Sequence, residues 1–333
     1  MKWLKPMQKI TIIDSTLRDG SHAIRHQIPK NAIEDYAKSA ESAGVEILVV
    51  GHGNGLSASS IHLGQSAVSD QEMLSTAKKE LKRTKLAAFA IPGFATLRDI
   101  DLAVSEGVEV LFVASHCTEA NVTKRYIKHS KVLTYGVLMM SHMADKLKLL
   151  EQAKLMENYG AAGVLLMDSA GAYLPEEVES KINFLANNLT IPVGFHAHNN
   201  LGMAVINSVV AVKNGATLID ATTRGFGAGA GNAQLEVVLA VLEKLGYDTE
   251  VDLYSLFKGS EVIAKLKEPQ LISPLSIMSG LNGVFSGFAP LVIKAAHKYK
   301  VEASDIFREL GKRKVVAGQE DQIIEVAKFL KHE

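Results

Sequence analysis

The stretch "DKLKLLEQAKLMENYGAAGVLLMDSAG", at residues 145–171, shows the pattern that decides the fold. Residues 145–159 have the apolar spacing of an amphipathic helix, and Gly160 follows where a left-handed residue commonly ends a helix. The apolar run Gly163–Met167 is typical of a strand buried on both faces, and the polar residues Asp168 and Ser169 come directly after it. This order predicts one helix–strand unit of a parallel α/β fold.

The same unit recurs along the chain. Apolar runs of this kind lie at Ile10–Ile13, Glu46–Val50, Leu86–Ile91, Glu109–Val113, Thr134–Met140, Gly163–Met167, Ile191–Phe195 and Thr217–Asp220. Gly44, Gly107, Gly160 and Gly215 stand where the preceding helix would end. Eight such units predict an α/β fold of the (β/α)₈ TIM-barrel type. A doubly wound open sheet is the alternative, but the chain has no dinucleotide-binding fingerprint to support it.

The pattern changes after Tyr247. From about residue 262 the sequence has helical periodicity, with no strand between the helical stretches. We therefore predict a catalytic barrel at residues 1–261 and a helical C-terminal extension, a second domain, at residues 262–333.

Composition and charge narrow the class of protein. The 333 residues include 36 Lys and Arg against 36 Asp and Glu, so no basic excess is available for nucleic acid or an anionic membrane. The single cysteine, Cys117, excludes an internal disulfide framework and suits a reducing cytoplasm. The start of the chain, "MKWLKPMQK", lacks the apolar region of a secretory signal, and no apolar run reaches the roughly 18–20 residues needed to span a bilayer. We expect a cytoplasmic globular protein.

In a TIM barrel the reactive side chains lie where the strands end, which we call the carboxyl end of the barrel. The polar residues that follow the predicted strands are Asp14, Arg18, Asp19, His22, His52, His116, His142, Asp168, Ser169, His196, His198, Arg224 and Asn232. No lysine stands among them, so a Schiff-base aldolase would lack its nucleophile. The glycine-rich "GFGAGAGN", residues 225–232, is not followed by Lys-Ser/Thr and predicts a tight turn rather than a phosphate site.

Two histidines follow the seventh predicted strand in "IPVGFHAHNN", residues 191–200. If the strand continues, His196 and His198 point to the same side and can bind one metal ion. A pair of hydrogen-bonded structural histidines is an equally open interpretation. Asp19, across the barrel, would add the carboxylate that a divalent site with open positions needs.

Other residues at the carboxyl end are rival ligands. His52, His116 and His142 are more ordinarily explained as hydrogen-bonding residues that orient loops. Asp14 and Asp168 would either bind the ion or, as we prefer, support the ligands from behind.

Seven motifs follow one another along nearly the whole chain. They are "DSTLRDGSHA" (14–23), "HCTEANV" (116–122), "LMMSHM" (138–143), "MDSAGA" (167–172), "HAHNN" (196–200), "GAGAGNA" (227–233) and "GQEDQIIEVA" (318–327). Together they resemble the 4-hydroxy-2-oxovalerate aldolases. "DSTLRDG" and the histidine pair mark the wider superfamily of class II pyruvate aldolases, isopropylmalate synthases and hydroxymethylglutaryl-CoA lyases, whereas "HCTEA", "MMSHM" and "GQED" mark the aldolase branch.

The resemblance implies an enzyme that cleaves 4-hydroxy-2-oxopentanoate to pyruvate and acetaldehyde, or a related pair, with a divalent ion. The ion is commonly Mn²⁺, with Mg²⁺ or Co²⁺ as substitutes, and would be bound by Asp19, His196 and His198. Arg18 would stabilise the enolate, and His22 would remove the C4 hydroxyl proton as general base. The residues implied to contact the substrate are Arg18, Asp19, Ser169, His196 and Phe285.

The chain departs from the family pattern at three places. "HAHNN" stands where the family usually has "HAHHN", "DSAG" where it has "DSGG", and Phe285 where it has a tyrosine. None of the three involves an implied metal ligand, and we expect all of them to affect specificity, so a larger or different aldehyde is open. Asn232 matches a metal ligand of the lyase relatives and is expected only near the ion.

The resemblance also implies a partner. Family members form a complex with an acylating aldehyde dehydrogenase, and the C-terminal helices would be the interface. Two other functions stay open. A Claisen-type acyl-CoA condensing enzyme or lyase would use the same scaffold, but no basic cluster for coenzyme A is evident. A weakly catalytic partner subunit would have no use for Arg18, Asp19 and His22.

Overall fold

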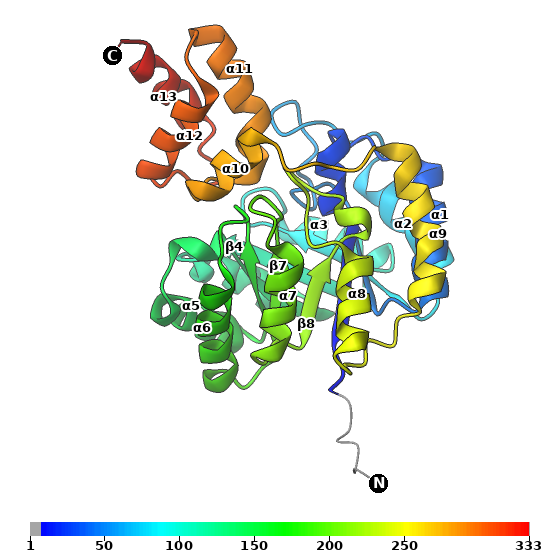
Figure 1. Ribbon diagram of the computed structural model, residues 1–333. Coiled ribbons are helices and arrows are strands. Elements are labelled where there is room, and N and C mark those ends of the chain that lie inside the picture. The colour runs from blue at the N-terminus through cyan, green and yellow to red at the C-terminus, as the bar shows by residue number, and fades with distance from the viewer. Residues whose placement is uncertain (1–7, 333) are drawn as a thin grey trace.

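Eight parallel strands form a closed barrel in the computed structural model, which describes residues 8–332 (Figure 1). The strands are β1 (Thr11–Leu17), β2 (Ile47–Val50), β3 (Lys85–Ala90), β4 (Val110–His116), β5 (Leu133–Met139), β6 (Val164–Asp168), β7 (Val193–Ala197) and β8 (Leu218–Ala221). They follow chain order around the barrel, and β8 pairs with β1. The predicted TIM barrel is confirmed. The segment "MKWLKPM", on which the prediction about a secretory signal rests, lies outside the described residues.

Several strands run further into polar sequence than the apolar runs predicted. β1 continues through Asp14, Ser15 and Thr16, and β7 continues through His196. These polar residues are fully buried, and the strands there still pair with their neighbours, Asp14 opposite Leu48 for example. Backbone pairing inside a closed barrel, which hydropathy does not report, decides where the strands stop.

Helices surround the barrel, and one follows each strand. They are α1 (Lys30–Ala43), α2 (Asp70–Glu80), α3 (Leu97–Ser105), α4 (Lys124–His129), α5 (Lys146–Tyr159), α6 (Pro175–Asn188), α7 (Ala204–Lys213) and α8 (Leu235–Lys244). As predicted, α1 and α5 end at Gly44 and Gly160, whose φ angles of 76° and 105° lie in the left-handed region. Among residues 8–332 no helix combines the length and the apolar character needed to cross a membrane.

Two apolar layers hold the barrel together. Side chains such as Ile13, Phe112 and Leu165 fill its interior. A larger layer lies between the strands and the surrounding helices, and it includes Phe195 and Ala197 from β7. Phe195 and Ala197 face the helices, so His196 between them points to the opposite side of the strand.

The C-terminal part divides after α9 (Leu253–Leu266), which packs against α1. The chain then forms α10 (Pro274–Leu281), α11 (Ala289–Tyr299), α12 (Ala303–Lys312) and α13 (Asp321–His332), which share a core of their own. In Figure 1 these four helices stand over one end of the barrel. The predicted division at residue 261 falls inside α9 and stays a prediction. The sequence did not predict α10, which is short and rich in serine and glycine.

Short 3₁₀ helices occupy several loops at the carboxyl end of the barrel. They are η1 (Asp19–Ile24), η2 (Ala120–Thr123), η3 (Ser141–Met143) and η4 (Thr223–Gly225), and η5 (Ser286–Phe288) precedes α11.

Candidate active site

Asp19, His196 and His198 converge at the carboxyl end of the barrel. Asp19 begins η1 directly after β1, His196 lies on β7, and His198 follows that strand by one residue. One ligand atom from each of the three lies within 4.8 Å of the others, and all three side chains are buried. Two nitrogen ligands and one carboxylate with room for further ligands suit a divalent transition-metal ion. The three residues therefore form a candidate metal site.

The buried nitrogens of the histidine pair test whether a metal fits. Among the described residues, both ring nitrogens of His196 and Nδ1 of His198 have no hydrogen-bond partner. An unpartnered buried polar atom is costly, and a metal ion would satisfy it. Burial is the main cause that lowers the pKa of His198 to about 3, so its ring is neutral, as a metal ligand must be. Burial alone would raise the pKa of Asp19, but the adjacent Arg18 guanidinium is the largest opposing cause, and the net effect lowers this pKa and keeps the carboxylate ionised. The residues present fit a metal ion.

Asp220 supports His196 from behind. Its Oδ2 lies 2.9 Å from His196 Nδ1, an ion-pair distance that lacks hydrogen-bond geometry, and both side chains are buried. A carboxylate behind a metal-binding histidine fixes the ring orientation and raises its basicity. Sequence reasoning missed this role, although a carboxylate that closes the eighth apolar run was a usable signal.

Arg18 lies beside the candidate metal site. Its guanidinium donates a 2.8 Å hydrogen bond to Asp19 Oδ2 and a 3.3 Å bond to the carbonyl of Gly53. The group also stacks over the ring of Phe89, 4.4 Å from its centroid, and only 3 % of the arginine is exposed. A cation fixed in a buried site stabilises negative charge far better than one in water.

His22, on η1, lines the cavity above the metal site, as His116 does. The ring is half-buried, and burial is the main cause that lowers its pKa from the ordinary 6.5. It is therefore neutral at physiological pH and able to accept a proton.

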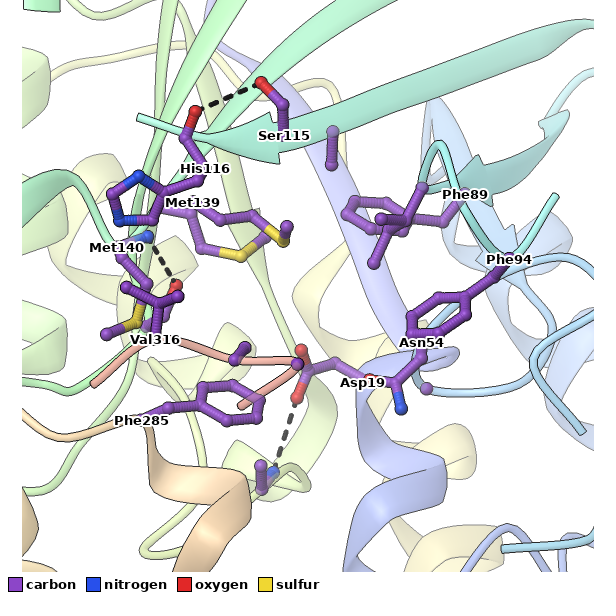
Figure 2. A pocket seen from close by; sticks show the side chains of 18 of the residues that line it. Asp19, Asn54, Phe89, Phe94, Ser115, His116, Met139, Met140, Phe285 and Val316 are labelled. Carbon is purple, nitrogen blue, oxygen red and sulfur yellow. Dashed lines mark hydrogen bonds between the residues drawn. The ribbon is translucent and has the colours of Figure 1, made fainter. Parts of the chain in front are cut away.

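A cavity of about 280 Å³ lies over these residues. Arg18, Asp19, His22, Ser169 and His198 line its polar side. Figure 2 shows Asp19 in the middle, Phe89 and Phe94 on one side, and Met139, Phe285 and Val316 on the other. The C-terminal helices thus complete the site, because Phe285 and residues 316–318 come from them and their loops. His22 and Phe285 also line a wider outer cavity. The cavity therefore suits a ligand whose small polar group lies against Asp19 and His198, which we call the floor, and whose apolar chain lies above it.

Ser169 lies at the junction of barrel and C-terminal helices. Its hydroxyl accepts a 3.0 Å hydrogen bond from the backbone N–H of Met140. Its carbonyl accepts hydrogen bonds from the N–H and the hydroxyl of Ser286, at 3.3 and 3.2 Å, and the Ser286 hydroxyl also lies 2.9 Å from Asn200 Oδ1. Ser286 directly follows Phe285, so these bonds fix the segment that brings Phe285 into the cavity.

The three rival histidines make hydrogen bonds elsewhere. The ring nitrogens of His52 bond the carbonyl of Gly64 and the N–H of Asn54, both at 3.0 Å. His142 Nε2 lies 3.0 Å from the carbonyl of Gly283, joining the barrel to the C-terminal helices, and His116 bonds its neighbour Thr118 at 2.8 Å. None belongs to the candidate metal group found in residues 8–332.

Asp14 and Asp168, the other two carboxylates considered as metal ligands, accept hydrogen bonds from the protein. Asp14 accepts hydrogen bonds from the N–H of Thr16 at 2.9 Å and from the hydroxyl of Tyr36 at 2.6 Å. Asp168 accepts bonds from the N–H groups of Ala172 and Tyr173, at 3.0 and 3.1 Å. Both carboxylates therefore stabilise segments at the carboxyl end of the barrel.

The glycine-rich segment at residues 225–232 folds into a tight turn. The N–H of Asn232 bonds back to the carbonyl of Gly225 at 2.9 Å, and Gly231 has a φ of 85°. Within the turn the N–H of Ala228 donates a 3.3 Å hydrogen bond to Asp19 Oδ1. The side-chain amide of Asn232 is buried and without a partner among the described residues, and its backbone pairs with His198. The Arg224 backbone N–H bonds Glu236, and its side chain does not line the cavity.

Of the three departures from the family pattern, only Phe285 lines the cavity. The side-chain oxygen of Asn199 accepts a 3.3 Å hydrogen bond from the N–H of Ala204 at the start of α7, and Ala170 is fully buried. The expectation that all three departures affect specificity stays a prediction, and Phe285 is the one that contacts the cavity directly.

Comparison with known proteins gives one consistent picture. The HMGL-like family matches residues 9–263, and the DmpG-like communication domain matches residues 270–332. A 4-hydroxy-2-oxovalerate aldolase of Pectobacterium atrosepticum is 53% identical over 329 residues, which are 97% of this chain and 96% of that protein. Those of Spirochaeta aurantia and Burkholderia pseudomallei are 52% and 50% identical, again over 97% of this chain and over 96% and 95% of their own lengths.

Solved structures of similar shape are more distant in sequence. The N-terminal domain of a putative aldolase from Bacteroides vulgatus superposes with a TM-score of 0.73 at 22% identity, covering 87% of this chain and 98% of that one. The carboxyl transferase domain of Rhizobium etli pyruvate carboxylase, with pyruvate and biocytin, has a TM-score of 0.84 at 13% identity, over 99% of this chain and 62% of that one. At these identities the likeness shows the fold alone.

Proposed function

We propose a role for each residue of this site, starting from one premise: the chain belongs to the HMGL-like family, and within it to the 4-hydroxy-2-oxovalerate aldolases. It is an aldolase and a carbon–carbon lyase. Of the three functions that the sequence left open, the relatives of about 50% identity favour this one over a Claisen-type enzyme and over a weakly catalytic subunit.

The metal is Mn²⁺, with Mg²⁺ or Co²⁺ as substitutes, held by Asp19, His196 and His198. The unpartnered nitrogens of the two histidines and the ionised Asp19 support this assignment. When bound there, the ion supplies Lewis-acid polarisation of the 2-oxo group and neutralises negative charge on the adjacent oxygens.

Arg18 and His22 carry out the remaining chemistry. A nitrogen of the neutral His22 ring accepts the proton of the C4 hydroxyl group. The C3–C4 bond then breaks, the aldehyde leaves, and the electron pair remains on the future pyruvate as an enolate. The enolate takes up a proton at C3 to become pyruvate, which balances the proton lost from the C4 hydroxyl. The guanidinium of Arg18 faces this charge, and its bonds to Asp19 and Gly53 hold it in place before the charge develops.

The substrate is a 4-hydroxy-2-oxo acid, either 4-hydroxy-2-oxopentanoate or one that releases a related small aldehyde. Its 2-oxo acid end lies at the polar floor, against Arg18, Asp19 and Ser169, which line the cavity; His196, implied by the resemblance as a further contact, is fully buried and does not line it. The aldehyde end points to the apolar side, where Phe285 lies. A floor that holds charge and walls that hold an apolar chain match the two halves of such a molecule.

The partner is an acylating aldehyde dehydrogenase bound through the C-terminal helices. The match of residues 270–332 to a communication domain supports this proposal. Phe285 and residues 316–318, from the same C-terminal part, also line the cavity. The C-terminal part would therefore contact both the aldehyde product and the dehydrogenase. Co-expression with such a dehydrogenase should give a stable complex, and two proteins that purify separately would contradict the proposal.

One observation carries the function: the candidate metal group lies in the floor of the cavity that Arg18 and His22 also line. The test is cleavage of 4-hydroxy-2-oxopentanoate, followed through the pyruvate and acetaldehyde released. Chelation should abolish the reaction and Mn²⁺ should restore it, while acetyl-CoA with a 2-oxo acid should give no condensation. Full activity after exhaustive chelation, or an acyl-CoA condensation faster than aldol cleavage, would overturn the proposal.

A further inference from the structure

Three histidines form a cluster on the barrel side of the cavity. His26 stacks on His52 with ring centroids 3.6 Å apart, and its edge meets His22 at 4.8 Å. Only His22 of the three lines the catalytic cavity. His26 and His52 are buried, His26 at the edge of the wider outer cavity, and the chemistry proposed above uses neither of them.

The two buried rings are committed to hydrogen bonds. His52 bonds the N–H of Asn54 and the carbonyl of Gly64. His26 Nδ1 lies 2.9 Å from the hydroxyl of Ser21 and accepts a 3.4 Å bond from the N–H of Gly53. Burial lowers the pKa of His26 to about 2 and that of His52 to about 4, so both rings are uncharged at neutral pH. They contrast with His196 and His198, whose free nitrogens suit a metal.

The backbone shows that the position of the His26 ring is strongly constrained. Arg25 and His26 have φ angles of 53° and 63°, in the left-handed region that side chains other than glycine rarely adopt. The N–H of His26 holds this turn with a 2.7 Å bond to the carbonyl of Ser21. Such strain persists only where surrounding contacts fix the conformation, and it is common at functional sites.

Gly53 connects the pair to the reaction. Its N–H bonds His26, and its carbonyl accepts the bond from Arg18. A Cβ atom on Gly53 would lie only 2.3 Å from His22 Nε2, so the His22 ring packs directly on this backbone. One residue thus contacts both groups that act on the substrate.

We propose that His26 and His52 are positioning residues of the aldol reaction. The two rings stack on each other and are fixed by hydrogen bonds to the surrounding loops, and in this way they hold Gly53 against His22 and Arg18. The inference rests on the proposed function, since it assumes that His22 and Arg18 perform the chemistry. His26 and His52 exchange no proton with the substrate. They fix the loop after β2, and this loop sets the ring plane of His22 and one side of the Arg18 guanidinium.

The experiment compares two substitutions, one at each histidine of the pair, that remove different features of its ring. His52→Phe keeps a flat ring but removes both hydrogen bonds. His26→Asn removes the ring but suits the left-handed backbone, which asparagine tolerates. We expect each to lower kcat about 10- to 100-fold, the order that an ångström-scale misplacement of a reacting group costs. The KM for the 4-hydroxy-2-oxo acid and the affinity for Mn²⁺, measured by electron paramagnetic resonance of the free ion, should stay at wild-type values.

Two further variants separate positioning from general damage. Since both histidines act through Gly53, the double variant His26→Asn/His52→Phe should lose no more kcat than the worse single variant, whereas independent losses would multiply. Gly53→Ala should reproduce the loss, because its new Cβ displaces His22. His129→Phe, on α4 and paired with Asp101 at 2.9 Å, is the matched control and should behave as wild type.

The outcomes distinguish the inference from the proposed function. A wild type that cannot cleave 4-hydroxy-2-oxopentanoate with Mn²⁺ refutes the function, and the inference falls with it. If the wild type is active and His52→Phe and His26→Asn match its kcat, only the inference is wrong. A loss of kcat with an equal loss of Mn²⁺ affinity and a lower melting temperature would also overturn it, because the pair would then be part of the general fold.

Discussion

The floor and the C-terminal wall of the cavity are built by different parts of the chain and by different chemistry. The floor consists of barrel residues, Asp19 and His198 among them, that are polar, buried and close enough to act on one group. The wall consists of Phe285, residues 316–318 and Glu320; all of these except Glu320 are apolar or small, and they lie partly exposed. The floor can hold charges in fixed positions because the barrel excludes water from them. The wall can only decide which molecules fit above it.

This difference predicts that changes in the floor remove the reaction, whereas changes in the wall alter its selectivity. The largest effect should come from His198→Ala. Loss of a direct ligand should weaken Mn²⁺ binding by more than the about 10- to 100-fold that loss of an outer partner costs, and turnover should fall to background. Phe285→Leu, in the wall, is the control and should bind Mn²⁺ normally. An active His198→Ala variant that binds Mn²⁺ tightly would contradict the assignment of the floor.

Asp220→Asn should have the next largest effect. It removes the carboxylate 2.9 Å from His196 Nδ1 while keeping the size of the side chain. Mn²⁺ affinity should fall about 10- to 100-fold, and excess Mn²⁺ should restore much of the turnover, because the direct ligands remain. Titration with Mn²⁺ measures both quantities. Wild-type affinity would show that Asp220 has no influence on His196.

The sequence predicted the floor better than the wall for a physical reason. A barrel brings the ends of its strands together, so Asp19 and His198 could be placed near each other from their positions after two apolar runs. Asp220 closes the eighth apolar run, which marks it as a candidate residue, but its spacing does not say that it faces His196. The stacking of His26 on His52 depends on two left-handed residues in a loop, which hydropathy does not encode. The approach of residues 316–318 depends on how a separate helical core packs on the barrel.

Ser286→Ala tests the connection between floor and wall. The hydroxyl of Ser286 is buried and bonds the carbonyl of Ser169 and Oδ1 of Asn200. Its loss should lower the free energy of unfolding by about 1–3 kcal/mol, because Asn200 Oδ1 loses its donor. The KM for the aldehyde in the synthetic direction should rise, since the segment that carries Phe285 loosens, while Mn²⁺ affinity should not change. Denaturant unfolding and aldehyde titration provide the measurements, and a fall in Mn²⁺ affinity would mean that floor and wall are not separable.

The smallest effect, and the one most specific to this chain, is expected for Phe285→Tyr. Phe285 lines the cavity together with Asp19 and Ser169, and its ring meets Phe288 edge-on at a centroid distance of 5.5 Å. A tyrosine keeps this packing and adds one hydroxyl near the aldehyde end of the substrate. One ordinary hydrogen bond is worth about 0.5–1.5 kcal/mol, so the preference for one face of the aldehyde can change by at most roughly tenfold. We expect the wild type to form both C4 enantiomers from pyruvate and acetaldehyde, and the variant to sharpen their ratio with little change in turnover, as chiral chromatography of the product would show. A wild type that already makes a single enantiomer, together with an unchanged ratio in the variant, would mean that the stereochemistry is decided at the floor and that the wall selects only for size.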